Sequence, residues 1–206
     1  MSKVVVCIHG IWMRGCEMCI LRSRLKRSGF QPVQFSYRSL TTSVDQAALK
    51  LQQFIQQKSL KVDKFVAHSM GGLVLNRYLS LAEINDPIKI VLLGSPVKGS
   101  EVARQVADNK LLKITLGSQK TGALIDGVNS WPENAKITMI AGSKPQGIGR
   151  LVSNIKGLPS DGAVLVKETL IEKNTHHIIR PVSHTGMLYS KDVSQLIDQF
   201  FKPQFR

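Results

Sequence analysis

The sequence has few acidic residues, and this bears on the kind of molecule that the protein could bind. Its 206 residues include 14 Asp and Glu against 28 Lys and Arg, which gives a formal net charge of +14. Such an excess favours acidic partners, such as an anionic membrane surface or an acidic substrate. A basic solvated surface without any dedicated partner is the interpretation of the charge that we favour. Nucleic acid is not expected as a partner.

The chain also lacks a long apolar run. A helix needs about 20 consecutive apolar residues to cross a bilayer, and no stretch approaches that length. Lys3 precedes an apolar run at the N-terminus, but that run is short and breaks at His9-Gly10 without an Ala-x-Ala cleavage pattern. We therefore expect a cytoplasmic protein that begins directly with a strand.

Cysteine is scarce, with three residues clustered near one end: Cys7, Cys16 and Cys19. An odd, clustered set does not form a disulfide framework. Cys16 and Cys19 make a single C-x-x-C, which would suit redox or zinc chemistry only with further partners. We expect instead that these cysteines pack on a helix, and that the protein needs no metal or other cofactor.

What the sequence does contain is a regular alternation of strand and helix patterns. Strands are expected at residues 4–8, 31–37, 62–68, 88–93, 137–141 and 176–179, and helices at 16–28, 43–58, 70–82, 101–108 and 191–202. This alternation predicts one α/β domain over residues 1–206, with about six mostly parallel strands and helices on both faces. Residues 97–135 look largely irregular and would form a lid or a pocket wall. The carboxyl ends of the strands should carry the functional loops.

The third predicted strand runs into Ala67-His68-Ser69-Met70-Gly71, which has the layout of a nucleophile elbow. In an elbow the serine occupies a strained turn between strand and helix, so small residues must flank it. Ala67 replaces the usual first glycine but is still small. An ordinary strand-to-helix turn would give the same short pattern, so Ser69 needs a base, an acid and oxyanion donors elsewhere.

His184 is the predicted base, because it lies in a loop between the last predicted strand and the last predicted helix. His176 and His177 fall inside that strand and would not reach a loop tip. His68 adjoins the serine but should be aimed elsewhere by the elbow, and His9 opens the loop after the first strand.

Asp161 is the predicted acid, because the expected chain order of the partners is serine, acid, histidine. Asp126 and Glu133 precede the penultimate strand, and a helix-dipole contact is enough to explain Asp192. Asp161 could alternatively serve only as a turn former beside Gly162.

Two backbone N–H groups should form the oxyanion hole. One is that of Met70, at the start of the helix after the nucleophile, and the other is that of Ile11, in the loop after the first strand. Each such donor is typically worth about 10²- to 10³-fold in rate.

Four motifs in this order resemble the α/β-hydrolase superfamily, and within it small bacterial lipases and esterases: Val-Val-Cys-Ile-His-Gly-Ile, Val-Ala-His-Ser-Met-Gly-Gly, Ser-Asp-Gly-Ala-Val and Val-Ser-His-Thr-Gly. The resemblance implies a minimal α/β-hydrolase fold and a Ser69–Asp161–His184 triad. It also implies an oxyanion hole of Ile11 and Met70 and a cofactor-free acyl-enzyme mechanism.

The leading functional hypothesis is therefore a serine esterase or lipase that cleaves a small-molecule ester or a lipid. A thioesterase or acyltransferase would use the same triad, and a non-catalytic basic binding module could share the fold. The basic residues Arg22, Arg24, Lys26 and Arg27 suggest contact with an anionic lipid surface. Gly147-Ile148-Gly149 is too small a fragment of a nucleotide fingerprint to predict nucleotide binding.

Overall fold

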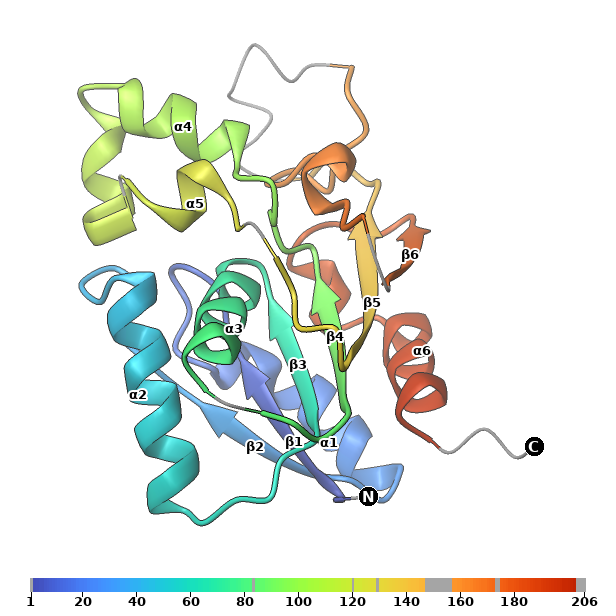
Figure 1. Ribbon diagram of the computed structural model, residues 1–206. Helices are drawn as coiled ribbons and strands as arrows, with labels where there is room; N and C mark the ends of the chain where they lie inside the picture. The colour runs from blue at the N-terminus through green and yellow to red at the C-terminus, as the bar shows by residue number, and fades with distance from the viewer. Residues whose placement is uncertain are drawn as a thin grey trace.

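Six parallel strands form one sheet in the computed structural model, which describes residues 2–82, 84–119, 121–128, 130–146, 157–172 and 175–202. The strand order is β2-β1-β3-β4-β5-β6. The bounds are β1 Val4–Ile8, β2 Gln31–Phe35, β3 Lys64–His68, β4 Ile88–Leu93, β5 Ala135–Gly142 and β6 Thr175–Arg180. The predicted α/β fold is confirmed (Figure 1).

The helices also lie close to their predicted positions. Their bounds are α1 Cys19–Arg27, α2 Val44–Gln57, α3 Met70–Leu81, α4 Glu101–Asp108, α5 Ala123–Asp126 and α6 Lys191–Phe201. Short 3-10 turns are η1 Cys16–Met18, η2 Leu112–Gln119, η5 Val166–Thr169 and η6 Gly186–Leu188. Helix α2 begins at a capping box, in which the Gln46 N–H donates to Ser43 Oγ and the Ser43 N–H donates to Gln46 Oε1, both at 3.2 Å.

The sheet is buried on both faces, so its strands contribute to two cores. Val6 and Ile8 of β1 pack with α2 and α3 on one face, whereas Val5 and Cys7 pack with α1 and α6 on the other. Successive side chains of a strand point to opposite faces, which explains why β1 is apolar at every position. No helix within the described ranges is long and apolar enough to span a bilayer.

Two expectations need correction. Cys16 and Cys19 do not pack in a core but are exposed, because Met18, Leu21 and Leu25 occupy the buried side of η1 and α1. Strand β2 ends at Phe35, two residues before Tyr37, at the edge of the sheet. An edge position also tolerates Pro32, which has no N–H to donate to a neighbour.

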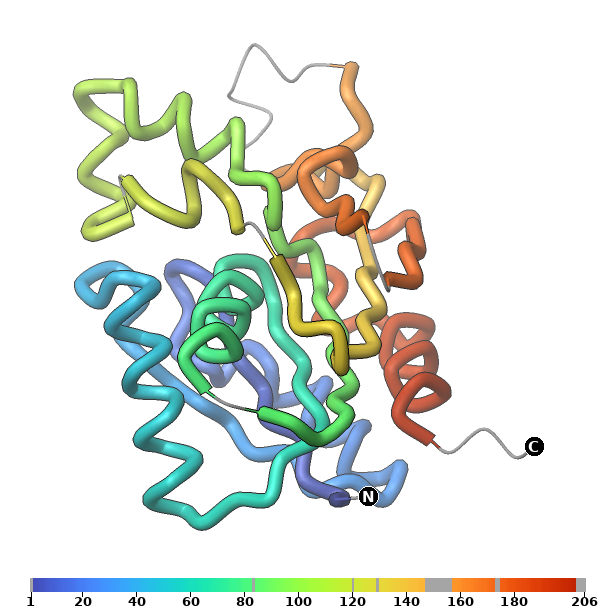
Figure 2. Tube along the Cα trace, in the orientation of Figure 1, coloured from blue at the N-terminus to red at the C-terminus, as the bar shows by residue number. Residues whose placement is uncertain are grey.

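The chain order of the sheet creates a crevice at its carboxyl edge. The connection from β1 leads to β2 and the connection from β3 leads to β4, so the two connections run in opposite directions along the sheet. α/β proteins bind ligands at the point where the connections diverge in this way. Residues 97–128, which contain α4, η2 and α5, lie over this edge (Figures 1 and 2). We call residues 97–128 the cap.

Short helical turns replace the irregular structure expected in the second half of the cap, and they are fixed to the loop before α2. Gln119 Nε2 donates to the carbonyls of Ser39 at 3.0 Å and Thr42 at 2.7 Å. The Ser118 N–H donates to the Leu40 carbonyl at 2.7 Å. These contacts join segments that are distant in sequence, so no local sequence pattern predicts them.

Candidate active site

Ser69 occupies the strained turn that the sequence pattern predicts. Its backbone has φ 55° and ψ −128°, a conformation that L-residues rarely adopt, and Met70 begins α3 immediately afterwards. The small residues behind it are sterically required. A Cβ on Gly71 would lie 2.6 Å from the Ile8 carbonyl oxygen, and one on Gly72 would overlap the Ser95 side chain. Strand β1 and helix α3 therefore press together behind the serine.

His184 and Asp161 form a tightly held pair. The His184 Nδ1–H donates to Asp161 Oδ2 at 2.7 Å, and the His184 backbone N–H donates to the Asp161 carbonyl at 2.9 Å. Asp161 is almost fully buried. Its other carboxylate oxygen, Oδ1, accepts the N–H groups of Ala163 at 2.9 Å and Val164 at 2.8 Å. The carboxylate is thus hydrogen-bonded on both oxygens, and in the neutral form of His184 it selects the tautomer that carries its proton on Nδ1.

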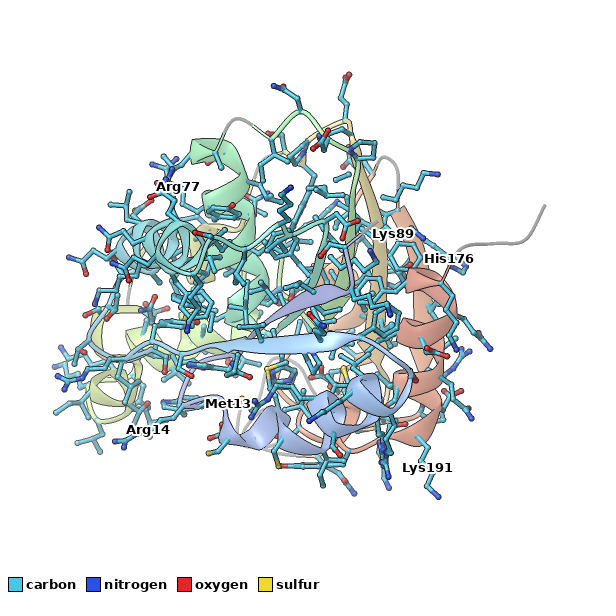
Figure 3. The ribbon with its side chains drawn as sticks, turned by 90° about the horizontal axis from the view of Figure 1, so that it is seen from below. Met13, Arg14, Arg77, Lys89, His176 and Lys191 are labelled. Carbon is cyan, nitrogen blue, oxygen red and sulfur yellow. The ribbon has the colours of Figure 1, made fainter. Side chains whose placement is uncertain are left out.

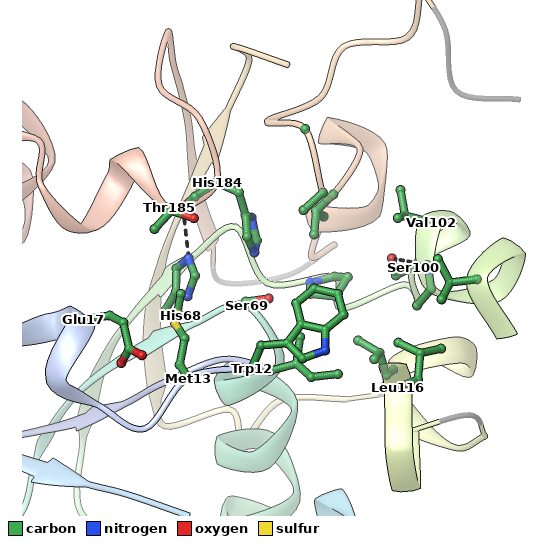
Figure 4. A pocket seen from close by; sticks show the side chains of 18 of the residues that line it. Trp12, Met13, Glu17, His68, Ser69, Ser100, Val102, Leu116, His184 and Thr185 are labelled. Atoms are coloured by element: carbon green, nitrogen blue, oxygen red, sulfur yellow. Dashed lines mark hydrogen bonds between the residues drawn. The ribbon is translucent and has the colours of Figure 1, made fainter. Parts of the chain in front are cut away.

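Ser69 and His184 open into one largely apolar cavity of about 360 Å³. Figure 4 shows Ser69 below the His184 ring, with the Trp12 indole beside them. The cap supplies part of the apolar wall, through Val102, Ala103, Val106, Leu116 and Leu124. No hydrogen bond joins the Ser69 and His184 side chains in the described part of the chain.

Of the two residues predicted to donate to the oxyanion, Ile11 lines this cavity, and Met70 directly follows Ser69, which also lines it. Met70 follows Ser69 in the first turn of α3, where backbone N–H groups have no acceptor within the helix. The Ile11 N–H donates no hydrogen bond to any residue that the structure describes. Both amides are therefore available to a ligand oxygen.

A buried aromatic clamp shapes the loop that carries Ile11. His9 stacks on Tyr37 with ring centroids 4.5 Å apart, and the Tyr37 hydroxyl donates to the His9 carbonyl at 3.0 Å. His9 Nδ1–H donates to the Gly10 carbonyl, while the Tyr37 N–H donates to His9 Nε2. Burial lowers the pKa of His9, so the ring is neutral and holds the loop by hydrogen bonds. The role of Tyr37 has no signal in the sequence, because it depends on a ring 28 residues away.

His68 lies closer to the site than the sequence suggested. Its ring is buried 4.6 Å from the His184 ring, and its Nε2–H donates to the His184 carbonyl at 3.0 Å. Burial and, to a lesser extent, the neighbouring His184 lower the pKa of His68 to about 3. A neutral His68 therefore anchors the loop that bears His184 without adding charge.

Two glycines at strand ends are also part of the site and were not singled out from the sequence. A Cβ on Gly94, which has φ 55°, would lie 2.8 Å from Asp161 Oδ2 and 3.2 Å from His184 Nδ1. A Cβ on Gly142 would lie 2.7 Å from Asp161 Cβ. The only sequence signal is that each glycine closes a buried strand. The Asp161–His184 pair thus requires glycine, which has no side chain, at the ends of the neighbouring strands β4 and β5.

Apart from His68, which lines the cavity, the alternative acids and bases among the described residues lie outside it. His176 is exposed on β6, away from the cap in Figure 3, and His177 pairs with Thr169 Oγ1 at 2.8 Å. Asp192 pairs with Arg180 at 2.8 Å, and neither Asp126 nor Glu133 lines the cavity. Of the residues considered, the structure brings Ser69, Asp161 and His184 together.

The site offers no obvious place for a metal. No group of three or more His, Cys, Asp or Glu side chains in the described ranges could hold one. The Gly147–Gly149 fragment lies outside the described residues.

Comparison with known proteins shows similarity of structure without detectable similarity of sequence. No protein-family model and no curated protein matches the chain. Lipase BlEst2 of Bacillus licheniformis, in its mature form, is 18% identical over 91% of this chain and 86% of its own, with a TM-score of 0.68. Carboxylesterase CesB of Bacillus subtilis is 10% identical over 97% and 83%, with a TM-score of 0.61. Phospholipase PlaB of Legionella pneumophila is 17% identical over 81% of this chain but only 45% of its own, with a TM-score of 0.66. At such identities the likeness concerns the fold.

Proposed function

From its α/β-hydrolase fold and the geometry of the cavity, we propose that this chain is a serine hydrolase of carboxylic esters. Ser69 is the nucleophile, His184 the base and Asp161 the acid. The observation that carries the proposal is the 2.7 Å bond between a buried Asp161 and His184, in a cavity that also contains a serine on a strained elbow. The lipase, carboxylesterase and phospholipase among its structural neighbours support the same class.

The proposed reaction follows from the tautomer of His184. Ser69 Oγ attacks the ester carbonyl carbon while its proton moves to His184 Nε2. The N–H groups of Ile11 and Met70 stabilise the oxyanion, and the imidazolium then protonates the departing alcohol. Water repeats these steps on the acyl-enzyme and releases the acid. In this proposal the hydrogen bond between Ser69 and His184 forms when substrate binds, as is common for catalytic hydrogen bonds.

The apolar cavity wall favours an acyl chain as the group beside Ser69. A thioester, or transfer to an acceptor other than water, would use the same residues and differ only in the leaving group or acceptor. A non-catalytic binding module would not need the hydrogen-bonded Asp161–His184 pair, so the pair favours catalysis. The three unpaired cysteines are compatible with the cytoplasmic location proposed for the enzyme.

Ser69→Ala tests the proposal directly. We expect a loss of about 10⁶-fold in kcat against an ester panel graded by acyl length, because removing a triad serine has that effect elsewhere. Ser95→Ala is the matched control, since Ser95 is another buried serine at a strand end but does not line the cavity. It should retain activity and fold. An ester hydrolysis rate in Ser69→Ala equal to that of the parent would refute the assignment.

A further inference from the structure

The turn after α4 exposes large aliphatic side chains to an unusual degree. Leu111 is 84% exposed, Ile114 78% and Leu112 44%. No other large apolar side chain in the described ranges exceeds 49%. Single exposed leucines are ordinary on protein surfaces, but a contiguous cluster marks an interaction site.

This exposure belongs to an ordered turn. Asn109 Oδ1 accepts the N–H groups of Leu111 at 3.0 Å and Leu112 at 3.1 Å, and the Asn109 carbonyl accepts the Lys113 N–H at 2.9 Å. The next turn places Leu116 in the cavity wall. The segment therefore has an inner face that lines the cavity and an outer face that projects Leu111 and Ile114 into solvent.

Cationic side chains surround the exposed aliphatic residues. Lys110 and Lys113 are exposed, and neither forms an ion pair with a residue that the structure describes. Arg14 and Arg38 line a neighbouring surface hollow together with Trp12 and Leu40, and Figure 3 shows Arg14 on the cap side of the molecule. Asp108 is the nearby exposed acid in sequence. Aliphatic residues flanked by lysines complement an anionic lipid surface. The aliphatic side chains can enter the hydrocarbon layer, and the lysines can pair with the negatively charged headgroups.

The helix that first suggested a lipid contact is a poorer candidate. Arg24 Nη1 donates to the Tyr189 carbonyl at 2.8 Å and to Ser194 Oγ at 3.2 Å, so it holds α1 against α6. The Nε of Arg22 is buried. Only Lys26 and Arg27 remain exposed there, without a neighbouring aliphatic cluster of comparable exposure.

We propose that Lys110, Leu111, Leu112, Lys113 and Ile114, here named the 110–114 surface, dock the protein on an anionic lipid bilayer. Trp12 connects this surface to the cavity. Its indole lines the cavity, is 46% exposed, and donates through Nε1–H to the Thr115 carbonyl at 2.7 Å. This proposal rests on the proposed function and makes it more specific, because a hydrolase docked on a bilayer would act on a membrane lipid ester. Docking itself does not require Ser69.

Vesicle co-sedimentation of the Ser69→Ala protein separates docking from turnover. We expect binding to phosphatidylcholine vesicles that contain phosphatidylglycerol, and weaker binding to phosphatidylcholine alone. Leu111→Ser with Ile114→Ser should lower the partition coefficient on both vesicles by about 10- to 100-fold. Lys110→Gln with Lys113→Gln should lower it on the anionic vesicles by about fivefold for each lysine, and added salt should do the same.

Two control pairs test whether the effect is local. Lys26→Gln with Arg27→Gln removes the same charge from α1, and Ile20→Ser with Ile179→Ser removes exposed aliphatic residues elsewhere. Both controls should bind like the parent. Equal losses in the controls, or no binding by the parent, would overturn the docking surface. A parent dimer that Leu111→Ser with Ile114→Ser dissociates would assign the surface to a second copy instead. Ester turnover without vesicle binding would leave the hydrolase proposal standing and remove this one.

Discussion

Backbone strain in this protein is concentrated at the cavity. Among the described non-glycine residues only Trp12, Ser59 and Ser69 have positive φ, and two of these three line the cavity. Such conformations cost about 1–3 kcal/mol each and persist only where the surroundings impose them. At Ser69 the surroundings include the Leu93 carbonyl, which accepts the Ser69 N–H at 2.8 Å.

Residues of the site differ in how well the sequence reveals them. Ser69 stands in a pattern whose small neighbours have a steric cause, and the loop positions of Asp161 and His184 follow from chain order. His68, Tyr37 and Gly94 were not predictable as site residues, because each acts on a partner far away in the chain. The Trp12 indole likewise donates to a partner far away in the chain, the Thr115 carbonyl.

Gly94→Ala should lower kcat/KM by about 100-fold, because a shift of roughly 1 Å in a catalytic group has that effect. The new Cβ would meet Asp161 Oδ2 and His184 Nδ1 at 2.8 and 3.2 Å and force the pair to move. Steady-state kinetics with one chromogenic ester would measure the loss.

Gly29→Ala is the control, since Gly29 also has positive φ, at 92°, but no heavy atom lies within 4 Å of its added Cβ. Both variants should lose some stability through backbone strain, and only Gly94→Ala should lose activity. Unchanged kinetics in Gly94→Ala would mean that the pair does not depend on this close approach.

At the scale of elements, the strands and long helices were predictable, including α4 of the cap, and the rest of the cap was not. The regular elements carry continuous apolar runs or helical spacing, and the capping box of Ser43 and Gln46 marks the start of α2. In the cap, by contrast, Gly117 has φ 55° at a kink and lies against the Leu40 backbone. Its conformation is set by the loop it touches, which local spacing cannot encode.

Gln119→Leu should loosen the cap from the loop before α2. The substitution leaves the buried carbonyls of Ser39 and Thr42 without their donor, which costs about 1–3 kcal/mol in the free energy of unfolding. Hydrogen exchange should accelerate in residues 38–42 and 112–119, and KM for longer acyl esters should rise.

Gln105→Leu is the comparison, because among the described residues the Gln105 side-chain amide donates only to the partly exposed Glu101 on the same helix. It should change exchange little. If exchange in residues 112–119 were equal in both variants, Gln119 would not be the anchor of the cap.

At the scale of the whole molecule, alternating patterns were enough to predict a parallel sheet with helices on both faces. They also placed the functional loops at its carboxyl edge, where the connections from β1 and β3 diverge. The net charge of +14 indicated a class of partner but not its location. The proposed docking site could come only from the structure, because the basic residues near Leu111 and those of α1 look alike in sequence.

The central claim is that the folded chain activates Ser69 as a nucleophile. A fluorophosphonate probe followed by peptide mapping tests this most directly, because it reacts only with an activated serine. We predict a phosphonate adduct on the peptide that contains Ser69 in the native protein, and no adduct after unfolding in urea. An unlabelled native protein, or an adduct on a different serine, would contradict the claim.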